Sequence, residues 1–150
     1  MDDALADILP HRPPMVMIDA LVRCDGESAV AVKTFWPEGY GSDGERVIEV
    51  ALIECLAQTM AAFQATETAR RAGRRPARGM LVGVSGFAFH LPARCGRPVR
   101  LRVEVIRRLG PLCLAAGRVE QDGALVAEGN LKFYIEEERG DVAKAPTAPG

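Results

Sequence analysis

The sequence is poor in the residues that build several common kinds of site. Aromatic residues make up only 5% of the chain and no nucleic-acid-binding motif is present, so we expect no nucleic-acid partner. No Cys-x-x-Cys pair occurs among its four cysteines, which argues against a zinc site and is typical of reduced thiols in a cytosolic protein. We expect neither a metal nor a cofactor. Histidine occurs twice, as His11 and His90.

Long apolar runs are also missing. The longest fall well short of a membrane span, and the acidic start MDDALADILPH lacks the basic region of a secretory signal. We therefore expect no membrane span and a cytoplasmic location. The 150 residues are 48% apolar and 26% charged, enough for one domain with a core and too few for two ordinary ones. We predict a single domain over residues 1–137 and a disordered tail over residues 138–150.

Arginine is concentrated in one part of the chain. Between residues 70 and 108 every basic residue is arginine, and Glu104 is the only acidic one. Such a stripe suits a phosphate or an acidic protein partner. It is equally typical of a solvated face whose arginines complement a helix C-terminus. The candidates for substrate binding follow the long helix described next: Arg74, Arg75 and Arg78.

Residues 42–72 are predicted to form one long helix. Ser42 and Glu45 have the spacing of a capping box at its start, and Gly73 is a plausible stop. Apolar residues over positions 47–63 occupy nearly every angular position, which predicts a helix wrapped by other elements.

Glu54 stands inside this apolar run, with Gln58 one turn later on the same face. A buried carboxyl group is costly, and desolvation raises its pKa toward the value that a general acid needs at neutral pH. The alternative is a Glu54 that pairs with an arginine or faces a wet interface.

Six strands are predicted around this helix. A hairpin precedes it and four strands in meander follow it, with turn signals between them. Since one helix cannot bury itself, an antiparallel sheet must curl around it, which makes the fold α+β. The predicted strands cover residues 15–24, 27–35, 80–91, 99–109, 112–121 and 124–135.

Three segments carry a resemblance to a known family. They are Leu-Pro-His-Arg-Pro-Pro at residues 9–14 with the strand that ends at Asp19, Ile-Glu-Cys-Leu-Ala-Gln at residues 53–58, and residues 87–99. Together they resemble the hotdog-fold 3-hydroxyacyl-(acyl-carrier-protein) dehydratases over residues 5–136, and most of all the dehydratase-like subgroup of aryl-polyene pathways. The resemblance implies a hotdog fold, with a six-stranded antiparallel sheet around one central helix.

The resemblance also implies site residues. In this family a glutamate of the central helix works with a histidine fourteen residues earlier; here these positions are Glu54 and Tyr40. A tyrosine, with a pKa of about 10, is a poor base at pH 7 but donates hydrogen bonds to a thioester carbonyl or a hydroxyl. The implied roles are catalysis for Glu54 and Tyr40 and substrate binding for Gln58. His11 in the opening motif is expected to be mainly structural, and His90 a surface or interface residue.

The function implied is that of a dehydratase-like lyase on acyl thioesters of fatty-acid or polyene biosynthesis. Its expected partners are an acyl carrier protein with its phosphopantetheine-linked chain, or acyl-CoA, together with a second hotdog chain in a homodimer or hetero-oligomer. Two alternatives stay open. One is a thioesterase in which Glu54 activates water; the other is a non-catalytic subunit of an active dehydratase, which the tyrosine at position 40 favours.

Overall fold

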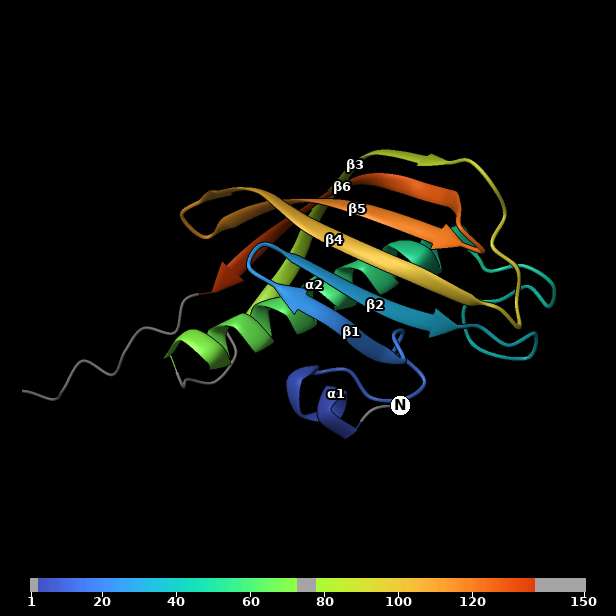
Figure 1. The fold of residues 1–150 in the computed structure, drawn as a ribbon, viewed down its shortest axis with the longest axis horizontal. Helices are drawn as coiled ribbons and strands as arrows, with labels where there is room; N and C mark the ends of the chain where they lie inside the picture. Colours follow the sequence, from blue (N-terminus) through green and yellow to red (C-terminus); the bar gives the residue numbers. More distant parts are fainter. Residues whose placement is uncertain (1–2, 73–77, 137–150) are drawn as a thin grey trace, which may run out of the picture.

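The computed structural model describes residues 3–72 and 78–136 (Figure 1). Two helices and six strands follow one another along the chain. They are α1 (Asp3–Ile8), β1 (Ala20–Asp25), β2 (Ser28–Thr34), α2 (Glu49–Ala72), β3 (Arg78–Phe89), β4 (Pro98–Leu109), β5 (Leu112–Gln121) and β6 (Ala124–Glu136).

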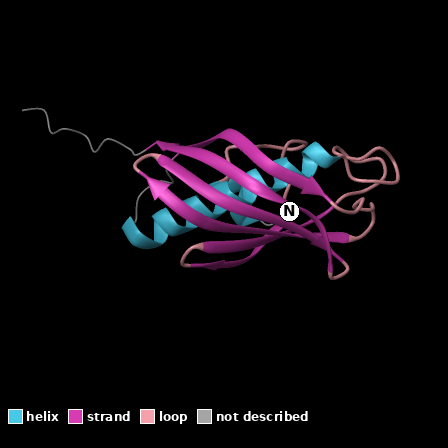
Figure 2. Ribbon diagram, turned by 90° about the horizontal axis from the view of Figure 1, so that it is seen from above, coloured by secondary structure: helices cyan, strands magenta, loops and turns pink. Residues whose placement is uncertain are grey.

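The six strands form one antiparallel sheet in the order β1-β2-β4-β5-β6-β3, and this sheet curls around α2 (Figure 2). The predicted hotdog architecture is confirmed. The predicted meander of four strands is wrong for β3, which pairs with β6 at the far edge of the sheet instead of with β4. Alternation of apolar and polar residues specifies that a segment is a strand, but it does not specify its partner.

The segment after β3 carries the chain back across the molecule. Backbone hydrogen bonds tie it to the loop before α2: Val47 N–H donates to Ala93 O (2.9 Å), Cys95 N–H to Glu45 O (3.0 Å) and Gly96 N–H to Phe35 O (2.7 Å). These contacts bring β4 next to β2 and leave β3 on the outer side of β6.

Helix α2 ends at Ala72, as predicted, but it begins at Glu49 and not at residue 42. The side chains of Ser42 and Asp43 accept hydrogen bonds from backbone N–H groups two and three residues later, which forms turns instead of a helix cap. The carboxylate of Glu45 pairs with Arg94 across the surface. The capping-box prediction is therefore wrong.

The first predicted strand also begins later than expected. The sheet starts at Ala20, and residues 15–19 are not part of a strand, although Asp19 N–H donates to Val32 O (2.8 Å). The backbone groups of Met15 and Met17 are bound by the side chain of Gln58 on α2. The side chain of Gln58 thus makes the hydrogen bonds that a neighbouring strand would otherwise make to these two backbone groups.

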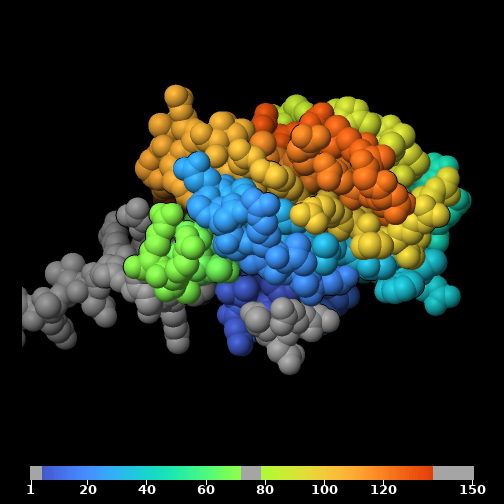
Figure 3. All heavy atoms as spheres, in the orientation of Figure 1, coloured from blue at the N-terminus to red at the C-terminus, as the bar shows by residue number. Residues whose placement is uncertain are grey.

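The core lies between α2 and the inner face of the sheet. Leu52, Leu56 and Phe63 of the helix are at most 1% exposed, and the inward residues of β4 are buried while Arg100, Arg102 and Glu104 face out, as the alternation predicted. In Figure 3 the C-terminal half of α2 reaches the surface beside the β1–β2 hairpin. No helix in residues 3–72 or 78–136 is long and apolar enough to cross a membrane.

One face of α2 is not covered by the sheet. Leu5, Leu9 and Met17 of the N-terminal segment bury part of it. A strip beyond that segment stays half-exposed, and it contains Glu54, Ala57, Ala61 and Gln64. This uncovered strip is where the candidate site lies.

Close approach of α2 to the sheet depends on Gly117 of β5. A Cβ atom there would lie 2.8 Å from methyl groups of both Leu56 and Leu131. We predict that Gly117→Ala lowers the free energy of unfolding by about 1–3 kcal/mol, since added volume in a packed core forces neighbours to shift. Denaturant unfolding measures this. The control is Gly83→Ala on β3, where the nearest atom would be 3.7 Å away; an equal loss in both variants would contradict the prediction.

Candidate active site

The side chain of Gln58 organises the site. It is 1% exposed. Because Gln58 follows Glu54 by four residues, the two side chains lie on the same face of α2. Its Nε2 donates to Glu54 Oε1 (2.8 Å) and to Met15 O (2.7 Å), while its Oε1 accepts from Met17 N–H (2.7 Å). A flipped amide would place two donors against each other at Met17, so the network fixes the orientation of the group.

Glu54 faces an open pocket. Its side chain is 35% exposed, so the predicted burial of this carboxyl group is wrong. The reason is that the sheet leaves this face of α2 uncovered. In the part of the chain that the structure describes, Glu54 has no arginine partner, and its carboxyl group is approached by Gln58 and His11.

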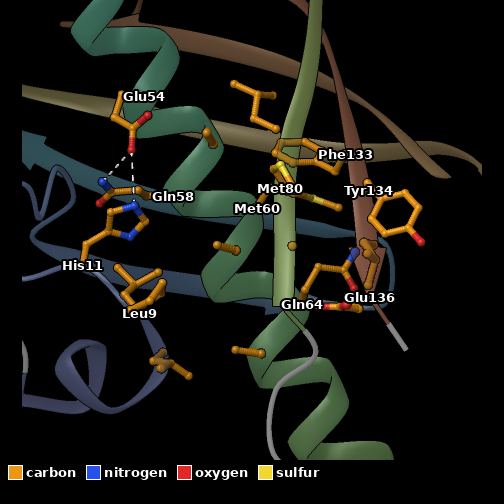
Figure 4. A pocket seen from close by; sticks show the side chains of 18 of the residues that line it. Leu9, His11, Glu54, Gln58, Met60, Gln64, Met80, Phe133, Tyr134 and Glu136 are labelled. Atoms are coloured by element: carbon orange, nitrogen blue, oxygen red, sulfur yellow. Dashed lines mark hydrogen bonds and ion pairs between the residues drawn. The ribbon is translucent and has the colours of Figure 1, made fainter. Parts of the chain in front are cut away.

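His11 lies next to Glu54. Its Nε2 is 3.7 Å from Oε1 of Glu54, and its side chain is 33% exposed (Figure 4). The Nδ1 atom is buried and has no hydrogen-bond partner among the described residues. This residue was expected to be structural, and the structure places it at the candidate site. Local sequence patterns do not predict this contact, because the two residues belong to segments far apart in the chain.

The pocket has a volume of about 1900 Å³. Its wall comes from the N-terminal segment, one face of α2, the start of β3, the β4–β5 turn and the end of β6. Figure 4 shows Glu54, Gln58 and His11 at one part of this wall and the apolar side chains of Met60, Met80 and Phe133 at another. An apolar hollow with a few convergent polar groups is the usual form of a small-molecule site.

Gln64 also lines the pocket. Its Nε2 is buried and makes no hydrogen bond to the residues that the structure describes. It therefore differs from Gln58, although both are glutamines of the same helix.

Tyr40 lies away from this pocket. It is 59% exposed in the loop before α2 and does not line the hollow. The next residue, Gly41, has a φ of +86° and packs inward, where a Cβ would meet Phe35 and Ala51 at 2.9 and 3.0 Å. Its carbonyl accepts a hydrogen bond from Ile48 N–H (2.9 Å). Within one chain, the structure does not bring Tyr40 to Glu54.

The structure describes only part of the predicted arginine cluster. Arg74 and Arg75 lie outside the described residues, and of Arg78 only the backbone is described, as the first residue of β3. The preceding arginines, Arg70 and Arg71, pair with the buried carboxylate of Glu67 at 2.8 and 3.2 Å. Those two side chains therefore have a structural role at the helix end.

The cysteines do not contribute to the pocket. The thiol of Cys55 points into the core and donates to Met17 O (2.9 Å), and burial raises its pKa far above the usual value. Within residues 3–72 and 78–136, no three His, Cys, Asp or Glu side chains are grouped so that they could hold a metal ion.

The chain is similar to known proteins over most of its length. The family described as ApeP dehydratase matches residues 3–144. The 3-hydroxyacyl-[acyl-carrier-protein] dehydratase FabZ of Bordetella pertussis is 34% identical over 140 residues, which cover 87% of this chain and 92% of the relative. FabZ of Myxococcus xanthus is 28% identical over 149 residues, which cover 94% of this chain and 95% of that protein.

Solved structures share the fold. The dehydratase heterocomplex ApeI:P from Xenorhabdus doucetiae superposes with a TM-score of 0.79 at 18% identity, covering 89% of this chain and 91% of that chain. A hypothetical thioesterase with coenzyme A from Streptococcus pneumoniae superposes with a TM-score of 0.65 at 8% identity, covering 81% and 88%.

The two glutamines of α2 give a matched test of the site's architecture. We predict that Gln58→Leu lowers the free energy of unfolding by about 2–4 kcal/mol, since two backbone groups would lose their partner. Gln64→Leu should be neutral or stabilising by about 1 kcal/mol, because it removes a buried donor that has no partner. Urea unfolding of both variants measures the difference, and equal losses would show that the Gln58 network does not stabilise the fold.

Proposed function

The chain belongs to the ApeP-like dehydratase family, and on that premise we propose that it removes water from 3-hydroxyacyl thioesters, with Glu54 as a reacting group. Its function is dehydratase-like. The observation that carries the proposal is the position of the Glu54 carboxyl group, which lines the pocket and is held by an amide that is itself locked to the backbone.

The reaction needs one base and one acid. The base removes a proton from C2, the electron pair forms the C2–C3 double bond, and the C3–O bond breaks. The acid gives its proton to the departing hydroxyl, which leaves as water. No oxidant or reductant enters this balance, and two protein side chains are sufficient.

In this proposal Glu54 acts as the acid. Both Gln58 and His11 approach its Oε1 atom, so among the described contacts Oε2 is left for a substrate. The hydrogen bond from Gln58 fixes the carboxyl plane. A positioned acid of this kind contributes about 10²–10⁴-fold to the rate.

The pocket suits a long acyl thioester, since its volume is about 1900 Å³ and part of its wall is apolar. We assign an acyl carrier protein as the donor of this substrate, because the FabZ relatives are named for carrier-protein substrates. Arg74, Arg75 and Arg78 are our candidates for contact with the phosphate of the carrier arm. The four cysteines, all free, fit a reducing cytoplasmic location.

A second hotdog chain is the other partner that we propose. Strand β3 pairs with β6 on one side, and no strand within residues 3–72 or 78–136 pairs with its other edge. Met80, Val82 and Val84 are exposed along it, at 63%, 48% and 42%. A long apolar edge strand is a template for pairing with another chain. The solved ApeI:P structure is itself a heterocomplex, and the exposed Tyr40 is free to serve the pocket of a neighbouring subunit.

The reaction is tested by intact mass. The protein is incubated with a 3-hydroxyacyl carrier protein, alone and with a related hotdog chain. We expect loss of one water from the acyl carrier protein, slowed about 10²–10⁴-fold in Glu54→Gln because the variant has no proton to give. Loss of the whole acyl group would instead establish a thioesterase. An unchanged rate in Glu54→Gln would refute the role of this residue.

The β3 edge is tested by oligomeric state. We predict that Val84→Lys shifts the protein toward the monomer, since a charge on this edge opposes pairing. The control is Val22→Lys, which adds the same charge at an exposed valine of β1, the opposite edge strand. Analytical ultracentrifugation measures both. Dissociation by the β1 variant alone would place the interface on the other edge.

A further inference from the structure

We propose that His11 is the base of the dehydration, so that one chain supplies both the acid and the base. This inference rests on the proposed function and names the second reacting group of the same pocket. The residue comes from the N-terminal segment and not from the loop before α2, where position 40 is a tyrosine.

The first argument is distance. His11 Nε2 and Glu54 Oε1 are 3.7 Å apart, and both side chains line the pocket with about one third of their surface exposed. Figure 4 shows the imidazole and the carboxyl group facing the same space. Two groups this close can reach neighbouring carbon atoms of one acyl chain. Removal of a C2 proton and a C3 hydroxyl requires this.

The second argument is the defined backbone of the segment that carries the imidazole. Leu9, two residues earlier, is 2% exposed, and its N–H donates to Leu5 O (2.9 Å). The guanidinium of Arg12 donates to the carbonyls of Leu9 (2.9 Å) and His11 (2.8 Å). These hydrogen bonds give residues 5–12 a defined local backbone, and the buried Leu9 packs that segment against the core.

The same side chain that holds Glu54 also holds the segment of His11. Gln58 binds the backbone of Met15 and Met17 while its Nε2 contacts the carboxyl group. One buried amide thus sets the spacing between the two reacting groups. A base and an acid prearranged in this way need no movement of the chain at the moment of reaction.

The third argument concerns which ring atom can react. Nδ1 of His11 is buried, so it cannot touch a substrate, and Nε2 is the atom that faces the pocket and Glu54. Proton transfer therefore runs through Nε2. Nδ1 has no hydrogen-bond acceptor among the described residues. The positive charge formed on the ring is therefore balanced by the nearby carboxylate of Glu54.

The protons balance over one turnover. His11 Nε2 takes the C2 proton, and Glu54 gives its proton to the departing hydroxyl, which leaves as water. The products are an imidazolium and a carboxylate 3.7 Å apart, and their opposite charges attract. Transfer of the proton from His11 to Glu54 restores the starting pair without a further reactant.

A base that acts at neutral pH is best supplied by a side chain that is partly unprotonated there. Histidine is the residue whose ordinary pKa lies near neutrality. The remaining titratable side chains of the pocket wall are Asp7, Arg12, Tyr134 and Glu136. The other histidine, His90, lies outside the pocket, where its Nε2 is 3.3 Å from Glu128 on the surface.

The test compares His11→Gln with His90→Gln, the matched control for loss of a histidine. Intact mass follows dehydration of a 3-hydroxyacyl carrier protein, in the complex with a hotdog partner if the wild-type protein needs one. We expect His11→Gln to lower kcat about 10²–10⁴-fold with little change in KM, and His90→Gln to leave both unchanged. Free imidazole should restore part of the lost rate, since the open pocket admits it.

His11→Asn is a second variant, and the unfolding midpoint of each variant shows whether it is folded. A wild-type rate in folded His11→Gln or His11→Asn would overturn the inference while leaving dehydration by this protein intact. A slower rate with a raised KM and no rescue by imidazole would also overturn it, because His11 would then act in binding or structure alone. A wild-type protein that removes no water in any combination would overturn the proposed function together with this inference.

Discussion

The amide of Gln58 lies buried between α2 and the segment of residues 15–19, and its nitrogen and oxygen are both hydrogen-bonded. Asp19 N–H donates to Val32 O of β2, but Met17 N–H and Met15 O have no backbone partner among the described residues, so without this amide both groups would lose their hydrogen bond. An unsatisfied buried polar group costs about 1–3 kcal/mol. The cost of losing these hydrogen bonds therefore keeps the segment against the helix. The third hydrogen bond of the amide goes to Glu54. Stability of the fold and orientation of the candidate acid therefore depend on the same side chain.

The pocket exists because α2 has more apolar and small surface than its own sheet covers. The sheet buries Leu52, Leu56 and Phe63, and the N-terminal segment covers a further part of the helix. The remaining strip stays open, and it is lined by alanines and by the polar groups of Glu54 and Gln64. An open strip beside an unpaired apolar edge strand is a place where a second chain and a substrate can both be accommodated. The dehydratase-like function of the family fits this combination.

Local patterns predicted most of the secondary structure. The alternation in β4 has its apolar residues buried and its charged residues exposed, and β5 has the bounds that its flanking turns predicted. The start of α2 could not be predicted in the same way. Ser42 and Glu45 carry the sequence signature of a helix cap, yet their side chains form a local turn and a surface ion pair, and the helix begins only at Glu49. A cap and a turn use the same residue types, so tertiary contacts of the loop decide between them.

Local periodicity and spacing are enough to predict one long helix wrapped by an antiparallel sheet, with Glu54 and Gln58 on one face of that helix. The partner of β3, the open face that exposes Glu54, and the approach of His11 could not be predicted in this way. Each of these depends on contacts between residues far apart in the chain. Such contacts form when backbone hydrogen bonds and buried volume are satisfied over the whole domain, and no local pattern in one segment encodes them.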